Sequence, residues 1–210
     1  MRILIIGEYS AFSENLRKGF QRIGHYCYVF SWGDVFKKIP FEANTYLVNV
    51  GYYKIGKWTV RGSRYIRRVF SAIKLNKKVR EMGKEDLFDI VLIINPAFLK
   101  TTNNPFIPRF SKQMVLNLVK SKDNIYLSAC GNDYIFNSYL PFMNDSNEFS
   151  LMKYYDNAER DKIEYESYLM LFKKIIPFNY DYAEAYRMKQ GLYGYMVCDS
   201  IPLPYDIEKT

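Results

Sequence analysis

The sequence lacks the short motifs that mark most nucleotide-binding and metal-binding proteins. Its eleven glycines include no pair in G-x-G spacing and no G-x-x-x-x-G-K-[ST], which excludes the dinucleotide fingerprint and the P-loop. No D-x-D occurs, and a single histidine, His25, cannot form H-E-x-x-H. The three cysteines, Cys27, Cys130 and Cys198, are far apart and match neither a zinc site nor a disulfide framework. We therefore predict no metal and no cofactor, and a reducing cytoplasm as the compartment.

Long apolar runs are missing too. No stretch approaches the roughly 18 apolar residues of a membrane span, and the run at 3–6 is too short for a secretory signal. A chain of 210 residues, 49% hydrophobic and 25% charged, suits one sizeable core or at most two small domains. The predicted location is cytoplasmic, with peripheral association at the inner face of the membrane left open.

Acidic residues are absent from one long interval. Between Glu42 and Glu81 there is no Asp or Glu. The same interval holds ten basic residues: Lys54, Lys57, Arg61, Arg64, Arg67, Arg68, Lys74, Lys77, Lys78 and Arg80. Because these ten exceed the net charge of +8, the rest of the chain is net negative and the interval forms a patch.

A helical pattern covers residues 64–82 of this interval. The predicted apolar stripe consists of Ile66, Val69, Phe70, Ile73 and Val79. The basic residues on the other faces include Arg64, Arg67, Arg68, Lys74 and Lys78. Such a helix can simply be solvated and packed on a sheet. It can also place these five basic residues on an anionic membrane surface. Nucleic acid is the least supported partner, because no recognition helix or RNA-binding motif accompanies the patch.

Strand and helix patterns alternate along the chain. Strands are predicted at 2–6, 25–30, 46–50, 88–94, 125–129, 175–178 and 195–198. Helices are predicted at 14–23 with Ser13 as N-cap, and at 64–82, 111–120, 157–166 and 182–189. Strands separated by helices predict an α/β fold, a Rossmann-like three-layer domain with a mainly parallel sheet and helices on both faces.

The beginning and the end of the chain resemble the N-terminal half of GT-B glycosyltransferases. The residues at 3–7, 16–25 and 29 resemble their first strand, a helix ending near Gly-His, and the second strand. Residues 176–182 resemble their late strand, loop and helix, and 201–206 resemble their interdomain linker. The resemblance covers nearly the whole chain. It implies an N-terminal, acceptor-binding domain at 1–200, the start of a linker at 201–210, and a donor-binding domain that is absent.

The resemblance implies a hexosyltransferase-type activity in polysaccharide biosynthesis. A sugar would pass from a nucleotide-sugar donor to a glycan or a lipid-linked acceptor, with a general base taking the proton from the acceptor hydroxyl. The chain alone is expected to be inactive, because the family binds most of the donor in the missing domain. Many relatives have a glycine-rich first loop. Gly7-Glu8-Tyr9-Ser10 has one glycine, which argues against close backbone approach to a ligand there.

Ligands of open parallel sheets gather beyond the carboxyl ends of the strands, so polar residues there are the candidates. Asp133 is the first choice for the general base and Glu8 the second. The predicted acceptor-binding residues are Gly7, Tyr9, Asn95, Asn132 and Asn179. Asn, Asp and Ser also occur in loops and helix caps without any function. The alternative is a non-catalytic, flavodoxin-like binding or regulatory module, although Glu8 alone matches a phosphorelay domain poorly.

Overall fold

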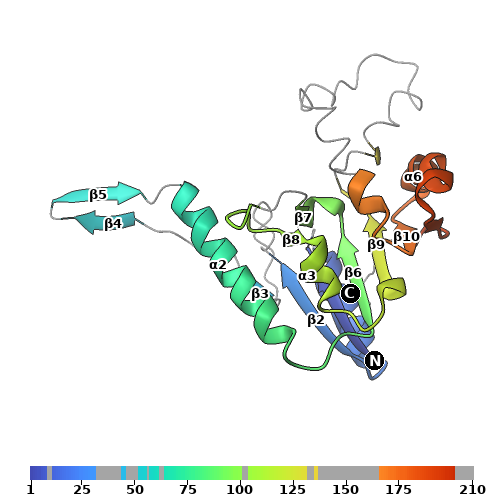
Figure 1. The fold of residues 1–210 in the computed structure, drawn as a ribbon, viewed down its shortest axis with the longest axis horizontal. Coiled ribbons are helices and arrows are strands. Elements are labelled where there is room, and N and C mark those ends of the chain that lie inside the picture. Colours follow the sequence, from blue (N-terminus) through green and yellow to red (C-terminus); the bar gives the residue numbers. More distant parts are fainter. Residues whose placement is uncertain are drawn as a thin grey trace, which may run out of the picture.

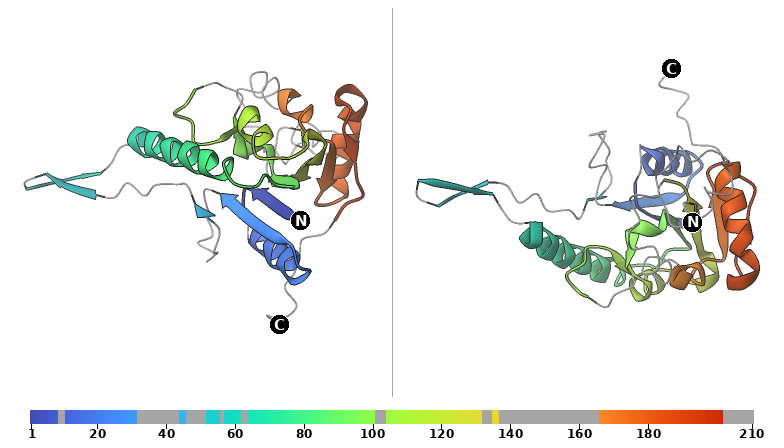
Figure 2. Two further views of the ribbon diagram at one scale, coloured as in Figure 1. Left: turned by 60° about the horizontal axis from the view of Figure 1, so that its bottom comes forward. Right: turned by 90° about the horizontal axis from the view of Figure 1, so that it is seen from above.

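In the computed structural model the chain folds around one parallel sheet with helices on both faces (Figures 1 and 2). The structure describes residues 1–8, 11–31, 44–45, 52–55, 57–61, 64–100, 104–131, 135–136 and 166–201. Seven strands form the sheet: β1 (Arg2–Ile6), β2 (Tyr26–Ser31), β3 (Asn44–Thr45), β6 (Ile90–Ile94), β9 (Ile125–Ala129), β10 (Lys174–Pro177) and β11 (Met196–Val197). Every pairing between them is parallel, which confirms the predicted fold class.

The order of the strands across the sheet is β11-β10-β9-β6-β1-β2-β3. From β1 the chain runs outward to β3 at one edge, returns to place β6 beside β1, and then runs to the other edge. This is the doubly wound Rossmann order, with its switch point between β1 and β6. A flavodoxin-like sheet has the order 2-1-3-4-5. The two-residue strand β3, paired outside β2, separates the two orders here.

The central strands are buried on both faces. Ile3, Leu4, Ile5 and Ile6 in β1 are at most 1% exposed, as expected for an apolar run in the middle of a parallel sheet. β1 and β9 have the predicted bounds. β6 begins two residues later than predicted, because Phe88 makes an isolated parallel bridge with Val119 instead of joining the sheet.

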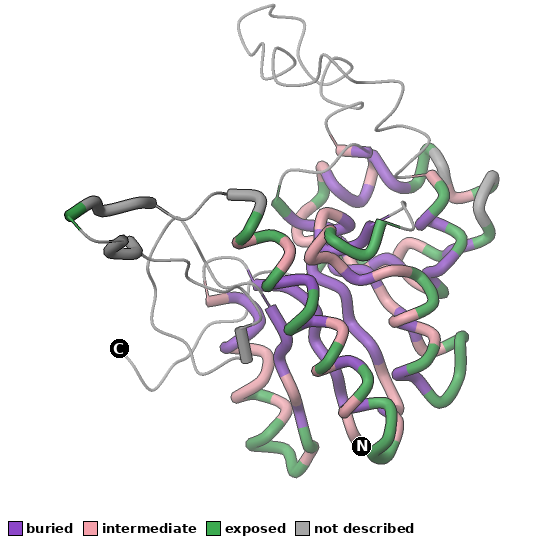
Figure 3. Tube along the Cα trace, turned by 60° about the vertical axis from the view of Figure 1, so that its left-hand side comes forward, coloured by how far each residue is buried: buried purple, intermediate pink, exposed green. Residues whose placement is uncertain are grey.

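Helices cover the two faces unequally. On one face lies α1 (Phe12–Arg22), which packs Phe12, Leu16 and Phe20 against inward residues of the sheet. The other face is covered by α2 (Arg64–Met82), α3 (Lys112–Leu116) and α6 (Tyr180–Tyr193). Figure 3 shows buried residues concentrated along the strands and the inner faces of the helices. No described helix is both long and apolar enough to cross a membrane.

Two predicted helix boundaries were wrong for local reasons. α1 begins at Phe12, and Ser13 lies inside it, donating its hydroxyl to the carbonyl oxygen of Gly7 instead of capping the helix. α3 ends at Leu116 instead of 120, because the chain then extends to exchange backbone hydrogen bonds with Phe88. Ser111 does cap α3, accepting from the N–H of Met114.

Smaller elements complete the description. They are η1 (Pro96–Phe98), β7 (Leu99–Lys100), β8 (Phe110–Ser111), η2 (Lys122–Asn124) and a helical turn at 166–169. α6 extends beyond the predicted 182–189 at both ends. The predicted strand at 46–50, nearly all of the predicted helix at 157–166 and all but Ile201 of the predicted linker lie outside the described residues.

An arm extends from the sheet domain. Its outer part is an antiparallel hairpin that the sequence patterns did not predict, β4 (Tyr52–Ile55) and β5 (Trp58–Arg61). The hairpin lies beyond the N-terminal end of α2, away from the sheet, in all views (Figures 1 and 2).

α2 itself has the predicted bounds, but the predicted apolar stripe was partly wrong. Its buried apolar side chains are Ala72, Leu75, Val79 and Met82. Those of Ile66, Phe70 and Ile73 are 43%, 54% and 54% exposed. The reason is that only the second half of α2 lies over the sheet, whereas its first half overhangs the edge (Figure 1).

Candidate functional site

The carboxyl ends of the parallel strands share one rim, where a ligand of this fold would bind. Gly7 follows β1, Asn95 follows β6 and Asn179 follows β10, so three predicted acceptor residues lie on this rim as expected. Gly131 follows β9 at the same rim. Tyr9, Asn132 and Asp133 lie outside the described residues, and their predicted roles stay predictions.

Glu8 lies at the switch point and caps α1. Its side chain is buried, and its two carboxylate oxygens accept from the backbone N–H groups of Ser13 at 3.3 Å and Glu14 at 3.1 Å. These are the second and third residues of the helix, whose N–H groups otherwise have no partner. An anion at this position is also favoured by the helix dipole. The carboxylate therefore takes the place that a phosphate occupies in nucleotide-binding relatives of this fold.

Gly7 is required by internal packing. Its φ is +109°, and a Cβ added to it would be 2.6 Å from two ring atoms of Phe98 and 2.8 Å from the carbonyl oxygen of Ile94. Phe98 is fully buried in the turn after β6. The close approach that glycine allows here is made by Phe98, a residue of the protein itself.

Asn95 ties the ends of two strands together. It is fully buried and has a φ of 67° with a ψ of 133°, a conformation that residues other than glycine rarely adopt. Its amide nitrogen donates to the carbonyl oxygen of Cys130 at 2.7 Å, and its side-chain oxygen accepts from the N–H of Ala97 at 2.7 Å. These contacts join β6 to the residue after β9 and begin η1.

The accessible part of the rim is the part beyond β9 and β10. Asn179 is half-buried and caps α6, accepting from the N–H of Tyr182 at 3.2 Å. The Tyr182 hydroxyl donates to the carbonyl oxygen of Gly131, and its ring stacks on Phe136 with the centroids 4.0 Å apart. Phe178 meets the same ring edge-on. Phe136 and Phe178 are half-buried, and their rings form an aromatic cluster with that of Tyr182 at this part of the rim.

The sequence patterns did not single out these aromatic residues. Tyr182 was predicted only as part of a helix, and Phe178 only as the end of a strand. The two are brought together with Phe136 by the pairing of β9 with β10. The one local signal was the position of Phe178 and Asn179 directly after a short apolar run.

The predicted membrane-facing residues all belong to α2. Arg68 and Lys74 are exposed, Arg67 and Lys78 are half-buried, and nothing is described of the Arg64 side chain. Lys78 pairs with Glu81 at 3.1 Å. Four of the five thus have described side chains, and these reach the solvent.

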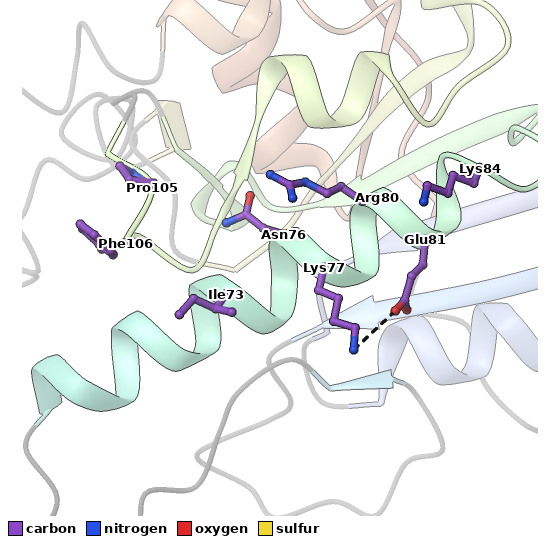
Figure 4. Close-up of a pocket in the computed structure, with 8 residues that line it drawn as sticks. All are labelled: Ile73, Asn76, Lys77, Arg80, Glu81, Lys84, Pro105 and Phe106. Carbon is purple, nitrogen blue, oxygen red and sulfur yellow. Dashed lines mark ion pairs between the residues drawn. The ribbon is translucent and has the colours of Figure 1, made fainter.

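A groove of about 550 Å³ lies between α2 and the segment before β8 (Figure 4). Apolar side chains line part of it, those of Ile73, Pro105 and Phe106. The remaining lining is polar and mainly cationic: Lys77, Arg80 and Lys84, together with Asn76 and Glu81. Lys100 holds the segment in place, donating its amine to the carbonyl oxygens of Asn104 at 3.0 Å and Ile107 at 3.4 Å. Burial lowers the pKa of Lys100.

Cys27 is buried, and its thiol is held in the protonated form. Burial raises the pKa of Cys27 to about 12, which leaves almost no thiolate at neutral pH. The described parts of the chain contain no group of three or more His, Cys, Asp or Glu side chains placed to hold a metal ion. Comparisons with protein-family models, with curated proteins and with solved structures give no match.

Proposed function

We propose that the chain is the acceptor-binding half of a glycosyltransferase. Its substrate would be a glycan or a lipid-linked acceptor whose hydroxyl receives a sugar from a nucleotide-sugar. The donor would be bound mainly by a further domain, and the present chain would then be inactive alone.

The observation that carries this proposal is the carboxylate of Glu8 at the N-terminus of α1. A Rossmann-like domain that binds a nucleotide uses this helix end for the phosphate. Here the two N–H groups already bind Glu8, so a phosphate would have to displace a buried internal carboxylate. A Rossmann-like half that holds the acceptor and leaves the nucleotide to another domain has no need of that phosphate position.

The second support is the accessible rim beyond β9 and β10. Aromatic rings can pack against the apolar faces of sugar rings, and amides can bind their hydroxyl groups. Phe178 and Asn179 are half-buried and follow β10 on this rim, and the half-buried Phe136 stacks on Tyr182. In this proposal Asp133 is the general base. Glu8 suits that role less, because both of its oxygens accept backbone hydrogen bonds.

The test is ligand mapping by NMR on backbone amides of the 210-residue chain. The acceptor probes are the methyl β-glycosides of glucose, galactose, mannose and N-acetylglucosamine, and the nucleotide probes are UDP, GDP and NADH. We expect a glycoside to shift the amides of Gly131, Phe178 and Asn179, and no nucleotide to shift those of Ser13 and Glu14. A nucleotide bound at the start of α1 would contradict the proposal, as would glycosides that shift nothing at this rim.

Catalysis is tested separately. The purified chain should not turn over a nucleotide-sugar in the presence of these glycosides. Turnover by the chain alone would refute the predicted dependence on a further donor-binding domain. Loss of that turnover in Asp133→Asn, but not in Asn137→Asp, would still support Asp133 as the base.

The non-catalytic binding module remains the second candidate. It is favoured by the internal hydrogen bonds of Glu8 and Asn95. Glu8 is the carboxylate described at the switch point, and its hydrogen bonds to α1 make it a poor general base. Glycoside binding at the β9–β10 rim would favour the transferase proposal over this one.

A further inference from the structure

The register of the β4–β5 hairpin groups residues of different chemical type on its two faces. Its register pairs Tyr53 with Val60 and Ile55 with Trp58 on one face. On the other face it pairs Tyr52 with Arg61 and Lys54 with Thr59. Residues that alternate along a strand lie on opposite faces, so one face collects aromatic and aliphatic residues and the other collects mainly polar and basic ones. An isolated two-stranded hairpin is marginal in water, which favours a partner for the apolar face.

α2 continues the apolar surface toward the sheet domain. Ile66, Phe70 and Ile73 are spaced by four and three residues and so form one stripe along the helix. All three are large apolar side chains about half exposed. Across the groove Phe106 is 46% exposed. In the overhanging half of α2 the apolar side therefore faces the solvent, whereas an ordinary surface helix buries that side.

Cations surround this stripe. In the part of the chain that the structure describes, five of them form no ion pair: Arg67, Arg68, Lys74, Arg80 and Lys84. Lys77 and Lys78 share the single carboxylate of Glu81. No acidic residue occurs between Glu42 and Glu81 to neutralise the others.

We propose that the arm formed by β4, β5 and the first half of α2 docks onto an anionic lipid bilayer. The stripe of Ile66, Phe70 and Ile73 enters the interface, the hairpin lies along it, and the flanking Arg and Lys side chains of α2 meet the headgroups. Trp and Tyr, which the hairpin supplies, are the residues favoured at the level of the headgroups. Basic residues near an anionic surface supply the attraction, and apolar side chains supply the depth.

The charge of the arm decides between this partner and two others. A second copy of the arm would bring two strongly positive surfaces together, which electrostatics disfavours. A nucleic acid would satisfy the cations, but it would leave the aliphatic residues Ile55, Val60 and Ile73 without a complementary surface. Only a bilayer offers both anions and an apolar interior.

Docking goes beyond the proposed function and rests on the arm alone. It suits an acceptor carried on a lipid, but it does not depend on sugar binding at the β9–β10 rim. Its test measures lipid binding without any glycoside or nucleotide, so the two proposals can fail independently.

The first experiment is co-sedimentation of the full chain with phosphatidylcholine vesicles, with or without 30% phosphatidylglycerol. We expect binding only to the anionic vesicles at about 50 mM NaCl, and loss of binding at about 500 mM. Arg67→Glu/Arg68→Glu should weaken binding by about 30-fold or more. The control Lys112→Glu/Lys122→Glu removes the same charge from exposed positions outside the arm and should weaken binding far less.

Insertion of the apolar side chains into the bilayer is tested by a second pair of substitutions. Phe70→Ser/Ile73→Ser should weaken vesicle binding by about tenfold or more, because it removes two side chains that enter the interface. Met170→Ser/Met188→Ser removes two equally exposed apolar side chains elsewhere and should leave binding unchanged. Far-UV circular dichroism confirms that each variant is folded.

Trp58 reports on the hairpin directly. The chain has two tryptophans, so Trp32→Phe leaves Trp58 as the only one. Its emission should shift to the blue with anionic vesicles and be quenched by brominated lipids. Absence of binding to both vesicle types would overturn the proposal. So would equal binding by all variants, or tighter binding to a 20-base-pair DNA duplex or to poly(U) that Phe70→Ser/Ile73→Ser leaves unchanged.

Discussion

The ring of Phe98 lies directly against Gly7, and a Cβ on Gly7 would be 2.6 Å from two of its atoms. This contact joins the loop after β1 to the turn after β6, on either side of the switch point. The space beside the Cα of Gly7 is therefore occupied by a side chain of the protein itself. The glycine is thus explained by packing, and the next substitution measures that packing.

Gly7→Ala should destabilise the fold by about 2–4 kcal/mol, because the methyl group overlaps Phe98 and the backbone has a positive φ. Urea unfolding measures the change. Gly19→Ala is the matched control, since Gly19 lies in α1 with nothing within 4 Å of an added Cβ. That control should stabilise the chain by about 0.5–1 kcal/mol. If the overlap is the cause, Gly7→Ala should cost less in a Phe98→Leu background.

Glu8→Ala should cost about 1–2 kcal/mol of unfolding free energy, because the N–H groups of Ser13 and Glu14 lose their acceptor. It should also open an anion site at the start of α1. We therefore expect phosphate at about 50 mM to raise the melting temperature of Glu8→Ala more than that of the wild type, with chloride at equal ionic strength as the reference. Equal shifts in the two proteins would show that Glu8 does not block a phosphate position.

Asn95 separates side-chain and backbone effects. Asn95→Gly loses the hydrogen bonds to Cys130 and Ala97 but adopts the positive φ easily. Asn95→Ala loses the same hydrogen bonds and is also strained by the positive φ. We expect Asn95→Ala to be less stable than Asn95→Gly by roughly 1 kcal/mol. Both should be less stable than the wild type in urea unfolding. The reverse order of the two variants would mean that the positive φ carries no cost.

Asp89 should make the free energy of unfolding fall more steeply as the pH is lowered. The amine of Lys120 and the N–H of Arg2 both donate to its carboxylate, and they hold the pKa of Asp89 below its ordinary 3.8. Because the folded pKa is the lower one, the unfolded chain binds more protons as the pH falls, and this stabilisation is lost through the folded pKa. Asp89→Asn should therefore lose less stability than the wild type between about pH 5 and 2. The control is Asp123→Asn, which removes an exposed carboxylate that is not part of these contacts.

Elements whose cause is local were predictable from the sequence. The apolar runs of β1 and β9 and the long periodic segment of α2 fixed their bounds without reference to the rest of the fold. The hairpin had a signal too, since residues 52–61 alternate around Gly56-Lys57, a usual hairpin turn composition. The basic residues Lys54, Lys57 and Arg61 lie among the aromatic residues of this segment, so we read it as part of a charged patch and not as two strands.

Features whose cause is tertiary were not predictable. The side of α2 that is buried depends on where the helix crosses the edge of the sheet, so periodicity selected Phe70 and Ile73 although they are exposed. Capping of α1 by Glu8 requires the left-handed Ala11, which turns the chain so that an acid three residues earlier reaches the helix. The position of Gly7, Asn95 and Asn179 on one rim followed from the parallel sheet, but the internal hydrogen bonds of Asn95 did not.

The switch point also shapes how the chain folds. β1 lies at the centre of the sheet, and one of its edges pairs with β2, which follows it in sequence after α1. Its other edge pairs with β6, and Asp89, directly before β6, is 87 residues from its partner Arg2. Closing so long a loop is slow, and an apolar strand with an open edge is prone to aggregate meanwhile. The tendency of β1 to aggregate should therefore fall once β6 has paired with its second edge.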